Sequence, residues 1–240
     1  MAEKTSLAVW VSVAIFATTC GLVQVASQRE ADAQAIRIGT YRPRFIVVFL
    51  DETGSRRKFW EPMRAKAALI ASRLKNKDAF TVIGIDDHGG DEDDVRVPLS
   101  IVQVPNDLQV AALNQQRQAI VQKVLSLAPR GNPQRTDIVG PIKQALRVAK
   151  MESRDRDTVL AFFSDMQQEP RMPDAAAFRD IRFPNGTKAY CFYVAASGRY
   201  DFQKTVDIWR PLLNSAGVAI GENDFHQLGT VDVGVDGAFH

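Results

Sequence analysis

The sequence predicts a doubly wound, Rossmann-like α/β fold with a mostly parallel central sheet, one antiparallel edge strand and helices on both faces. Residues 45–50 form an unbroken apolar run, and 158–163 is apolar after Thr158; such runs are typical of strands buried on both faces of a parallel sheet. Amphipathic helical patterns lie between such runs, and this alternation is typical of parallel sheets. Both runs end in polar residues, at the edge where open α/β sheets bind ligands.

The first half of the predicted domain begins with a buried strand. We expect this strand at 44–50, followed by an amphipathic helix within 55–76, where apolar residues recur every three or four positions. Further strands are expected at 79–85 and 95–104. A Gly-Gly turn between them indicates a hairpin, which supplies the antiparallel edge strand.

The second half alternates helices and strands. The amphipathic pattern of 107–127 predicts a helix that stops before Pro129, and a second helical pattern starts at Thr136. The remaining expected elements are a strand at 158–163, a strand at 188–196, a helix at 202–213 and a short strand at 216–220. From Gly221 onward the sequence has no clear periodicity, and we expect the chain to fray there.

Two charged stretches have a simple interpretation as solvated surface. The basic residues Arg56, Arg57 and Lys58 are expected on the wet side of their helix. The acidic loop 86–94 could bind calcium or a basic partner, but it lacks the calcium-loop pattern that ends in a distant glutamate. A solvated turn is the favoured interpretation of this loop.

The amino terminus carries an apolar segment. Residues 7–26 contain no charge and are long enough to cross a bilayer core, which takes about 20 residues. A retained transmembrane anchor is favoured over a cleaved signal peptide, for which small residues around Ala26 offer a site. Arginines after the segment favour a cytoplasmic domain, whereas the short amino tail with Lys4 resembles an export signal. We expect a membrane-anchored protein with an extracytoplasmic domain, or a secreted one if the segment is cleaved.

The length and the net charge of the chain indicate its domain organisation and argue against nucleic acid as a partner. The chain has 240 residues and a net charge of +2, too small to indicate nucleic-acid binding. We expect a signal anchor at 1–27, a linker at 28–43, one domain at 44–220 and a carboxyl-terminal tail at 221–240. With one of the two cysteines in the apolar segment, no disulfide is available within the domain.

Polar residues gather at the predicted ends of the strands. Asp51, Thr53 and Ser55 follow the first strand, and a carboxylate and hydroxyls at this spacing can face one point from a tight loop. Thr136 follows a turn-prone stretch, and Asp165 follows the strand at 158–163. Thr136 could also act as an N-cap. Carboxylate and hydroxyl oxygens are hard ligands, which suit Mg²⁺, Mn²⁺ or Ca²⁺ better than zinc.

These residues resemble the metal-ion-dependent adhesion site of von Willebrand factor type A (vWA) domains. Residues 51–55 resemble the family motif Asp-x-Ser-x-Ser, with Thr53 where serine is usual, and Thr136 and Asp165 match the later threonine and aspartate. The resemblance covers roughly residues 44–215. It implies a vWA fold, and a Mg²⁺ ion (or Mn²⁺ or Ca²⁺) that captures an acidic side chain of a protein partner.

Two other function classes compete with this hypothesis. A haloacid-dehalogenase-like phosphatase would need a second aspartate where Thr53 stands, and neither a P-loop nor an activated serine is evident. A metal-independent scaffold would use another surface. The sequence therefore favours a membrane-anchored, non-enzymatic interaction module without a small-molecule substrate.

Overall fold

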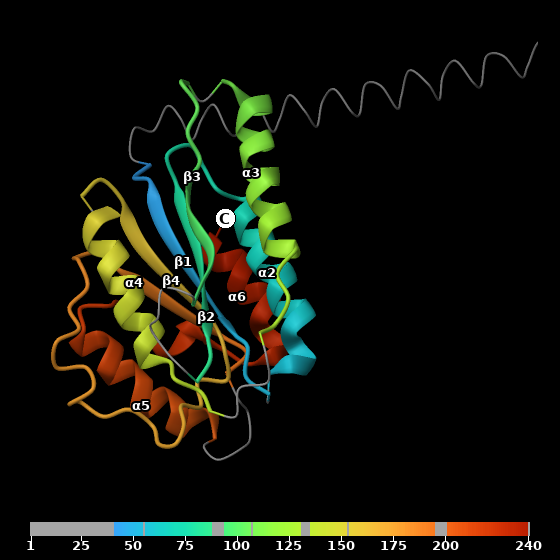
Figure 1. The fold of residues 1–240 in the computed structure, drawn as a ribbon. Coiled ribbons are helices and arrows are strands. Elements are labelled where there is room, and N and C mark those ends of the chain that lie inside the picture. The colour runs from blue at the N-terminus through green and yellow to red at the C-terminus, as the bar shows by residue number, and fades with distance from the viewer. Residues whose placement is uncertain are drawn as a thin grey trace, which may run out of the picture. The chain divides into compact units, whose positions relative to one another are not determined.

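The computed structural model describes residues 41–54, 56–87, 94–106, 108–130, 135–152, 154–194 and 201–239. Residues Pro43–His240 form one compact unit. Its centre is a six-stranded sheet with the order β3-β2-β1-β4-β5-β6. This arrangement, drawn in Figure 1, confirms the predicted fold class.

The sheet is parallel except at one edge. β1 (Arg44–Asp51) lies between β2 (Ala79–Ile85) and β4 (Asp157–Phe163) and is parallel to both. β5 (Lys188–Phe192) and the short β6 (Phe225–His226) continue the parallel order beyond β4. On the other side β3 (Val95–Ile101) pairs antiparallel with β2, as the hairpin predicts.

Helices cover both faces of the sheet (Figure 1). α2 (Trp60–Ser72), α3 (Val110–Leu125) and α6 (Val231–Phe239) pack into one hydrophobic cluster. α4 (Val139–Glu152) and α5 (Phe202–Ser215) pack into a second cluster on the opposite face. The described residues also form the 3-10 helices η1 (Arg57–Phe59), η3 (Glu222–Asp224) and η4 (Leu228–Thr230).

The central strand β1 is apolar from Phe45 to Leu50 because both of its faces are covered. Successive strand residues point to opposite faces. Phe45, Val47 and Phe49 accordingly belong to the cluster with α4 and α5, whereas Ile46 and Val48 belong to the cluster with α2, α3 and α6. Both faces of the strand are buried from Phe45 to Leu50, and its two charged residues, Arg44 and Asp51, lie at its ends.

Most of the expected elements are present, with small shifts at their ends. The strand expected at 188–196 ends at Phe192, because Tyr193 adopts a positive φ of 67° that extended chains do not have. The strand expected at 216–220 is reduced to one parallel bridge between Ala219 and Lys188.

The expectation that the chain frays from Gly221 is wrong. Phe225 lies in β6, and the α6 residues Val231, Val235 and Phe239 are buried against the sheet. Gly234 makes this docking possible, because a Cβ atom at that position would lie 2.6 Å from the His226 ring.

Several expectations fall on residues outside the described ranges. They are the apolar segment 7–26, most of the linker 28–43, the candidate ligand Ser55 and most of the acidic loop 86–94. Among the helices of the described residues, none combines the length and the apolar character needed to span a bilayer.

Candidate metal site

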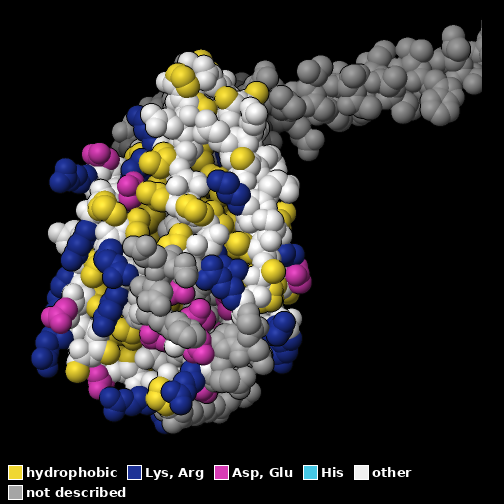
Figure 2. Space-filling model, viewed as in Figure 1, with side chains coloured by type: hydrophobic (Ala, Val, Ile, Leu, Met, Phe, Trp, Pro, Cys, Tyr) yellow, Lys and Arg dark blue, Asp and Glu magenta, His cyan; other side chains and the backbone are white. Residues whose placement is uncertain are grey.

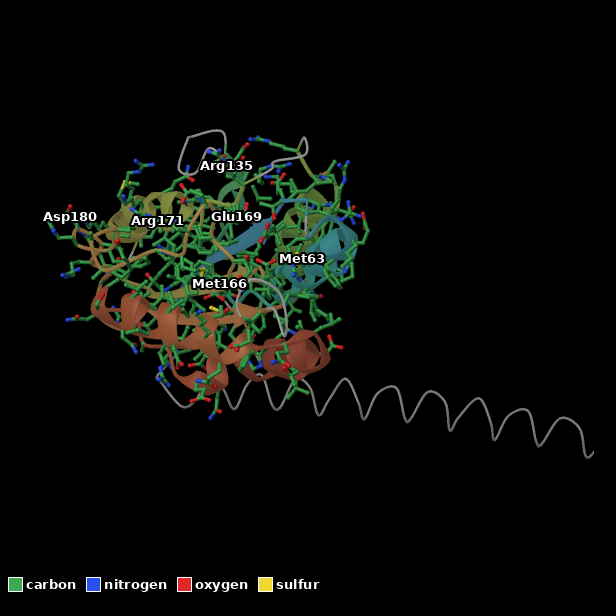
Figure 3. All side chains as sticks on the ribbon, turned by 90° about the horizontal axis from the view of Figure 1, so that it is seen from below. Met63, Arg135, Met166, Glu169, Arg171 and Asp180 are labelled. Atoms are coloured by element: carbon green, nitrogen blue, oxygen red, sulfur yellow. The ribbon has the colours of Figure 1, made fainter. Side chains whose placement is uncertain are left out.

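The carboxyl ends of β1 and β4 bring two acidic residues to the same edge of the sheet. Asp51 is the last residue of β1, and Asp165 follows the end of β4 at Phe163. The two strands are paired in parallel, with Leu50 opposite Phe163. Figure 3 looks onto this edge, and its labelled Met166 and Glu169 belong to the loop that follows β4.

Asp51 is fully buried, and hydroxyl and amide groups surround its carboxylate. Its Oδ1 accepts hydrogen bonds from the Thr53 amide at 3.0 Å and the Thr53 hydroxyl at 2.6 Å. Its Oδ2 accepts one from the Ser164 hydroxyl at 2.6 Å. Ser164 is therefore a member of the site that the sequence-based ligand set leaves out.

The electrostatic environment of Asp51 disfavours its charge. Burial, and then the negative charge of Asp165, raise the pKa of Asp51 from 3.8 to about 6, although hydrogen bonds from Ser164 and Thr53 act in the opposite direction. Within the described ranges, no basic side chain pairs with this carboxylate. Among the described residues, the Asp51 carboxylate is therefore buried at this edge without a positive partner.

Asp165 has a cationic partner. The Arg56 Nε donates to its Oδ2 at 2.8 Å, and the Gln167 amide donates to its Oδ1 at 2.9 Å. The Arg56 guanidinium also lies 5.2 Å from the centroid of the Phe59 ring. Only 15% of the Arg56 side chain is exposed, so the expectation that it belongs to a wet helix face is wrong.

Thr136 lies in a segment that is hydrogen-bonded to the loops after two strands, at the same edge of the sheet. Its carbonyl accepts a hydrogen bond from the Glu169 amide at 2.9 Å, and the next amide, of Asp137, donates to the Asp86 carbonyl at 2.7 Å. Asp86 follows β2, and Glu169 lies in the loop after β4. Arg135, beside Thr136, and Glu169 are both labelled in Figure 3.

The N-cap interpretation of Thr136 is wrong, because Asp137 does that work. The Asp137 Oδ1 accepts hydrogen bonds from the Val139 amide at 3.0 Å and the Gly140 amide at 3.2 Å, at the first turn of α4. Thr136 is buried, and its hydroxyl makes no hydrogen bond within the part of the chain that the structure describes. The structure thus brings Asp51, Thr53, Thr136 and Asp165 to one edge, while Ser55 lies outside the described residues.

Glu52, the acid between Asp51 and Thr53, is occupied elsewhere. It forms a buried ion pair with Arg96, and its Oε2 accepts a hydrogen bond from the Arg130 amide at 2.6 Å. Gly84 makes room for this carboxylate, since a Cβ there would lie 2.7 Å from the Glu52 Oε1. Glu52 therefore has a structural role and does not add to the charge at Asp51.

The donor set suits a hard cation. Two carboxylates and the hydroxyls beside them are the oxygen ligands that Mg²⁺, Mn²⁺ and Ca²⁺ prefer. Among the described residues, no three histidine, cysteine, aspartate or glutamate side chains cluster as a metal site. The fit depends on the hydroxyl oxygens together with Asp51 and Asp165.

The Ser164 hydroxyl at this edge is fixed in place by hydrogen bonds. Ser164 is completely buried, donates its hydroxyl hydrogen to Asp51 and accepts a hydrogen bond from the Met166 amide at 3.0 Å. The histidine of the described ranges, His226, stacks on Phe192 with ring centroids 5.3 Å apart. Its hydrogen-bonding groups are not part of the contacts around Asp51.

Comparison with known proteins identifies the fold. No family model and no curated protein matches the sequence. Among solved structures, proximal thread matrix protein 1 from the mussel byssus aligns with a TM-score of 0.52 and 12% identity, over 82% of this chain and 48% of the other. A von Willebrand factor type A structure from Catenulispora acidiphila aligns with a TM-score of 0.50 and 17% identity, over 83% and 42%.

The chain has a vWA-like fold. It spans about half the length, or less, of these solved structures. One structure of the mussel protein, with a TM-score of 0.52 and 12% identity over 82% of this chain, is described as having a zinc-occupied MIDAS motif. The candidate site of this vWA-like chain lies at the carboxyl ends of its strands, the edge where open α/β sheets bind ligands.

Proposed function

We propose that this chain is a membrane-anchored protein-interaction module with a metal-ion-dependent adhesion site. Asp51, Thr53, Ser55, Thr136 and Asp165 would hold a divalent cation. The cation, when bound, supplies positive charge and an open coordination position for the carboxylate of an acidic residue on a protein partner.

The buried carboxylate of Asp51 carries this proposal. A buried charge is costly unless it is paired or coordinates a metal. The hydrogen-bond donors to Asp51 are an amide and two hydroxyls, and its pKa is raised to about 6. A cation at this edge would remove the electrostatic penalty that raises this pKa.

The orientation of the hydroxyl groups supports the same proposal. Thr53 and Ser164 donate their hydrogens to Asp51. The Thr53 oxygen lies beside the Asp51 carboxylate as the donor of this hydrogen bond, and the Thr136 hydroxyl is not committed to another group of the described chain. Threonine at position 53, where serine is usual in the family motif, keeps the hydroxyl oxygen that could bind the cation.

Mg²⁺ is the proposed ion, with Mn²⁺ and Ca²⁺ as the other candidates. Two carboxylates balance one divalent charge, and Mg²⁺ is commonly bound by one or two carboxylates with other oxygen ligands. The zinc-occupied MIDAS motif of the mussel protein supports a divalent ion at a site of this kind.

The membrane attachment is a separate part of the proposal. It rests on the charge-free segment 7–26, with the linker 28–43 leading to the domain. We place the domain on the extracytoplasmic side, where an adhesion site would meet partners outside the cell. Carbonate extraction of membranes, with protease protection of the domain, tests both statements.

Calorimetric titration of Mg²⁺ and Mn²⁺ into the full chain in a non-ionic detergent tests the metal site. We expect saturable binding that is lost in Asp51→Asn and weakened in Thr136→Val. Thr158→Val is the matched control, because the buried Thr158 hydroxyl has no hydrogen-bond partner among the described residues but lies near the start of β4, at the opposite edge. A folded chain that binds neither ion contradicts the proposal.

A metal-independent scaffold is the second candidate, and the Arg56–Asp165 ion pair favours it. Arg56 already supplies a positive charge to one of the two carboxylates. The two candidates differ in how a bound partner responds to a chelator. A chelator would release the partner from a metal-dependent module, whereas the partner would stay bound to a metal-independent scaffold.

A further inference from the structure

The end of the domain opposite the candidate metal site exposes apolar side chains. Ile101 ends β3 opposite Ala79, the first residue of β2, and is 43% exposed. The connection to α3 adds Leu108 at 85% and Val110 at 52%, and the last turn of α4 adds Met151 at 68%. We call these four residues, with the basic residues below, the amino-edge face. Apolar side chains are visible at the upper end of the view in Figure 2.

Hydrogen bonds fix this face at the amino ends of the parallel strands. The Lys77 amide donates to the Val102 carbonyl at 2.7 Å, and the Val104 amide donates to the Asn76 side chain at 2.9 Å. The segment that carries Ile101, Leu108 and Val110 is thereby tied to the chain that enters β2. Figure 1 shows this connection at the same end as the start of β1.

Exposed basic residues lie at the same end. Lys75 and Lys77 precede β2, Arg154 precedes β4 and Lys188 begins β5. Asp155, which is also exposed, lies beside Arg154. Apolar side chains that are surrounded by lysine and arginine match the chemistry of a bilayer surface with anionic lipids, which takes up apolar groups and attracts basic ones.

The proposed anchor favours a bilayer as the occupant of this face. The compact unit begins at Pro43, whose carbonyl accepts a hydrogen bond from the amide of Asp157, the first residue of β4. The chain therefore enters the domain at the amino-edge face. Only residues 27–42 separate that entry from the charge-free segment 7–26.

We propose that the amino-edge face rests on the bilayer surface, with Ile101, Leu108, Val110 and Met151 at the lipid interface and Lys75, Lys77, Arg154 and Lys188 near anionic headgroups. This inference rests on the proposed anchor and is independent of the metal site. The parallel sheet then points its carboxyl ends away from the membrane, so that the edge holding Asp51 faces incoming partners.

Lipid contact can be measured with a nitroxide label on the full chain in nanodiscs. Gln109→Cys places the label between Leu108 and Val110, and Arg171→Cys places a reference label in the exposed loop after β4. Both are made with Cys20→Ala, since the other cysteine, Cys191, is fully buried. We expect the label at 109 to be more accessible to oxygen than to a water-soluble nickel chelate. The label at 171 should show the reverse order.

Lipid composition and substitutions separate the two contributions to this contact. When phosphatidylglycerol is added to phosphatidylcholine, the label at 109 should lie deeper in the bilayer. Added salt should reverse this increase in depth. Leu108→Asp with Val110→Asp should return the label to water. Leu228→Asp with Val233→Asp is the matched control at 58% and 76% exposure, and should leave it in place.

Each contrary result has a distinct meaning. A chain that does not enter nanodiscs contradicts the anchor and this inference with it. A chain that enters with the label at 109 in water overturns the face alone and leaves the metal proposal intact. If the label at 109 is shielded from the nickel chelate only when a disc holds more than one chain, the face binds a second copy of the chain. If the label lies equally deep in the bilayer in both lipid mixtures, the role of the lysines and Arg154 is overturned.

Discussion

The Arg56 Nε lies 2.8 Å from the Asp165 Oδ2, so the chain itself supplies a positive group to one of the proposed metal ligands. The guanidinium is held by this carboxylate and by the nearby Phe59 ring, and both charged side chains are largely buried. A cation that binds Asp165 must therefore compete with Arg56.

Removal of Arg56 should tighten metal binding. A hydrogen bond to a charged group contributes about 1.5–3 kcal/mol, so Arg56→Gln should lower the dissociation constant for Mg²⁺ about tenfold or more. Arg57→Gln is the matched control, because Arg57 has the same charge one residue along and is exposed. Calorimetric titration measures both, and an equal or weaker affinity in Arg56→Gln would show that Arg56 helps to form the site.

The unfolding free energy should depend on pH through Asp51. Its pKa is about 6 in the folded chain, against 3.8 for an aspartate free of these surroundings, so the folded protein binds the proton more tightly than the unfolded chain does. Stability from this group is present below about pH 4 and is lost as the pH rises toward 6, a decrease on the order of a few kcal/mol. Urea unfolding with a chelator present should show this slope.

Two controls isolate the contribution of Asp51 to that slope. Asp51→Asn cannot titrate and should remove the decrease between about pH 4 and 6. Added Mg²⁺ should also flatten it, because the ion stabilises the charged form. A slope that is unchanged in Asp51→Asn would assign the pH dependence to other groups.

Glu52 should matter for stability and not for metal binding. Glu52→Gln leaves Arg96 buried without its ionic partner, a change that costs about 3–5 kcal/mol. The affinity for Mg²⁺ should stay within about twofold, since the Glu52 side chain points to Arg96 and the Arg130 amide. Chemical unfolding and calorimetry give the two quantities.

The surface pair of Glu61 and Arg64 provides the comparison for Glu52. Glu61 is 70% exposed, and Glu61→Gln should cost less than about 1 kcal/mol. If Glu52→Gln abolishes metal binding in a chain that remains folded, Glu52 belongs to the site after all.

Two glycines of α6 should respond in opposite directions to alanine. Gly234→Ala places a Cβ 2.6 Å from the His226 ring, and overpacking of this kind costs about 1–3 kcal/mol. Gly237→Ala meets nothing within 4 Å and should stabilise the helix by about 0.5–1 kcal/mol. Thermal unfolding of the two variants tests the packing of α6. Equal shifts of the melting temperature in the two variants would contradict this packing.

The sequence predicts the sheet well because its strands carry strong local signals. β1 holds an unbroken apolar run from Phe45 to Leu50 that ends in Asp51, β2 is apolar apart from Thr81, and the expected span of β2 agrees with the structure. Asp51 and Asp165 are expected at one edge because parallel strands end at one edge. That part of the site depends on topology, which the alternation of strands and helices indicates.

The missed features depend on contacts between distant parts of the chain. Arg56 has the periodicity of a solvent-facing residue, and its pairing with Asp165 joins positions that lie 109 residues apart. α6 does contain a signal, since Val231, Val235 and Phe239 recur at every fourth position. Gly234 and Gly237 hide it, because glycine weakens an isolated helix while allowing close approach to the sheet.

The docking of α6 determines where the chain can be cut. The Tyr190 ring of β5 lies 5.8 Å from the Phe239 ring, and Phe192 stacks on His226 of β6. A fragment that ends at Gly221, at the carboxyl boundary that periodicity favours, would present these aromatic rings to water and invite aggregation. Fragments for expression should therefore extend through Phe239, and a carboxyl-terminal tag should begin only beyond it.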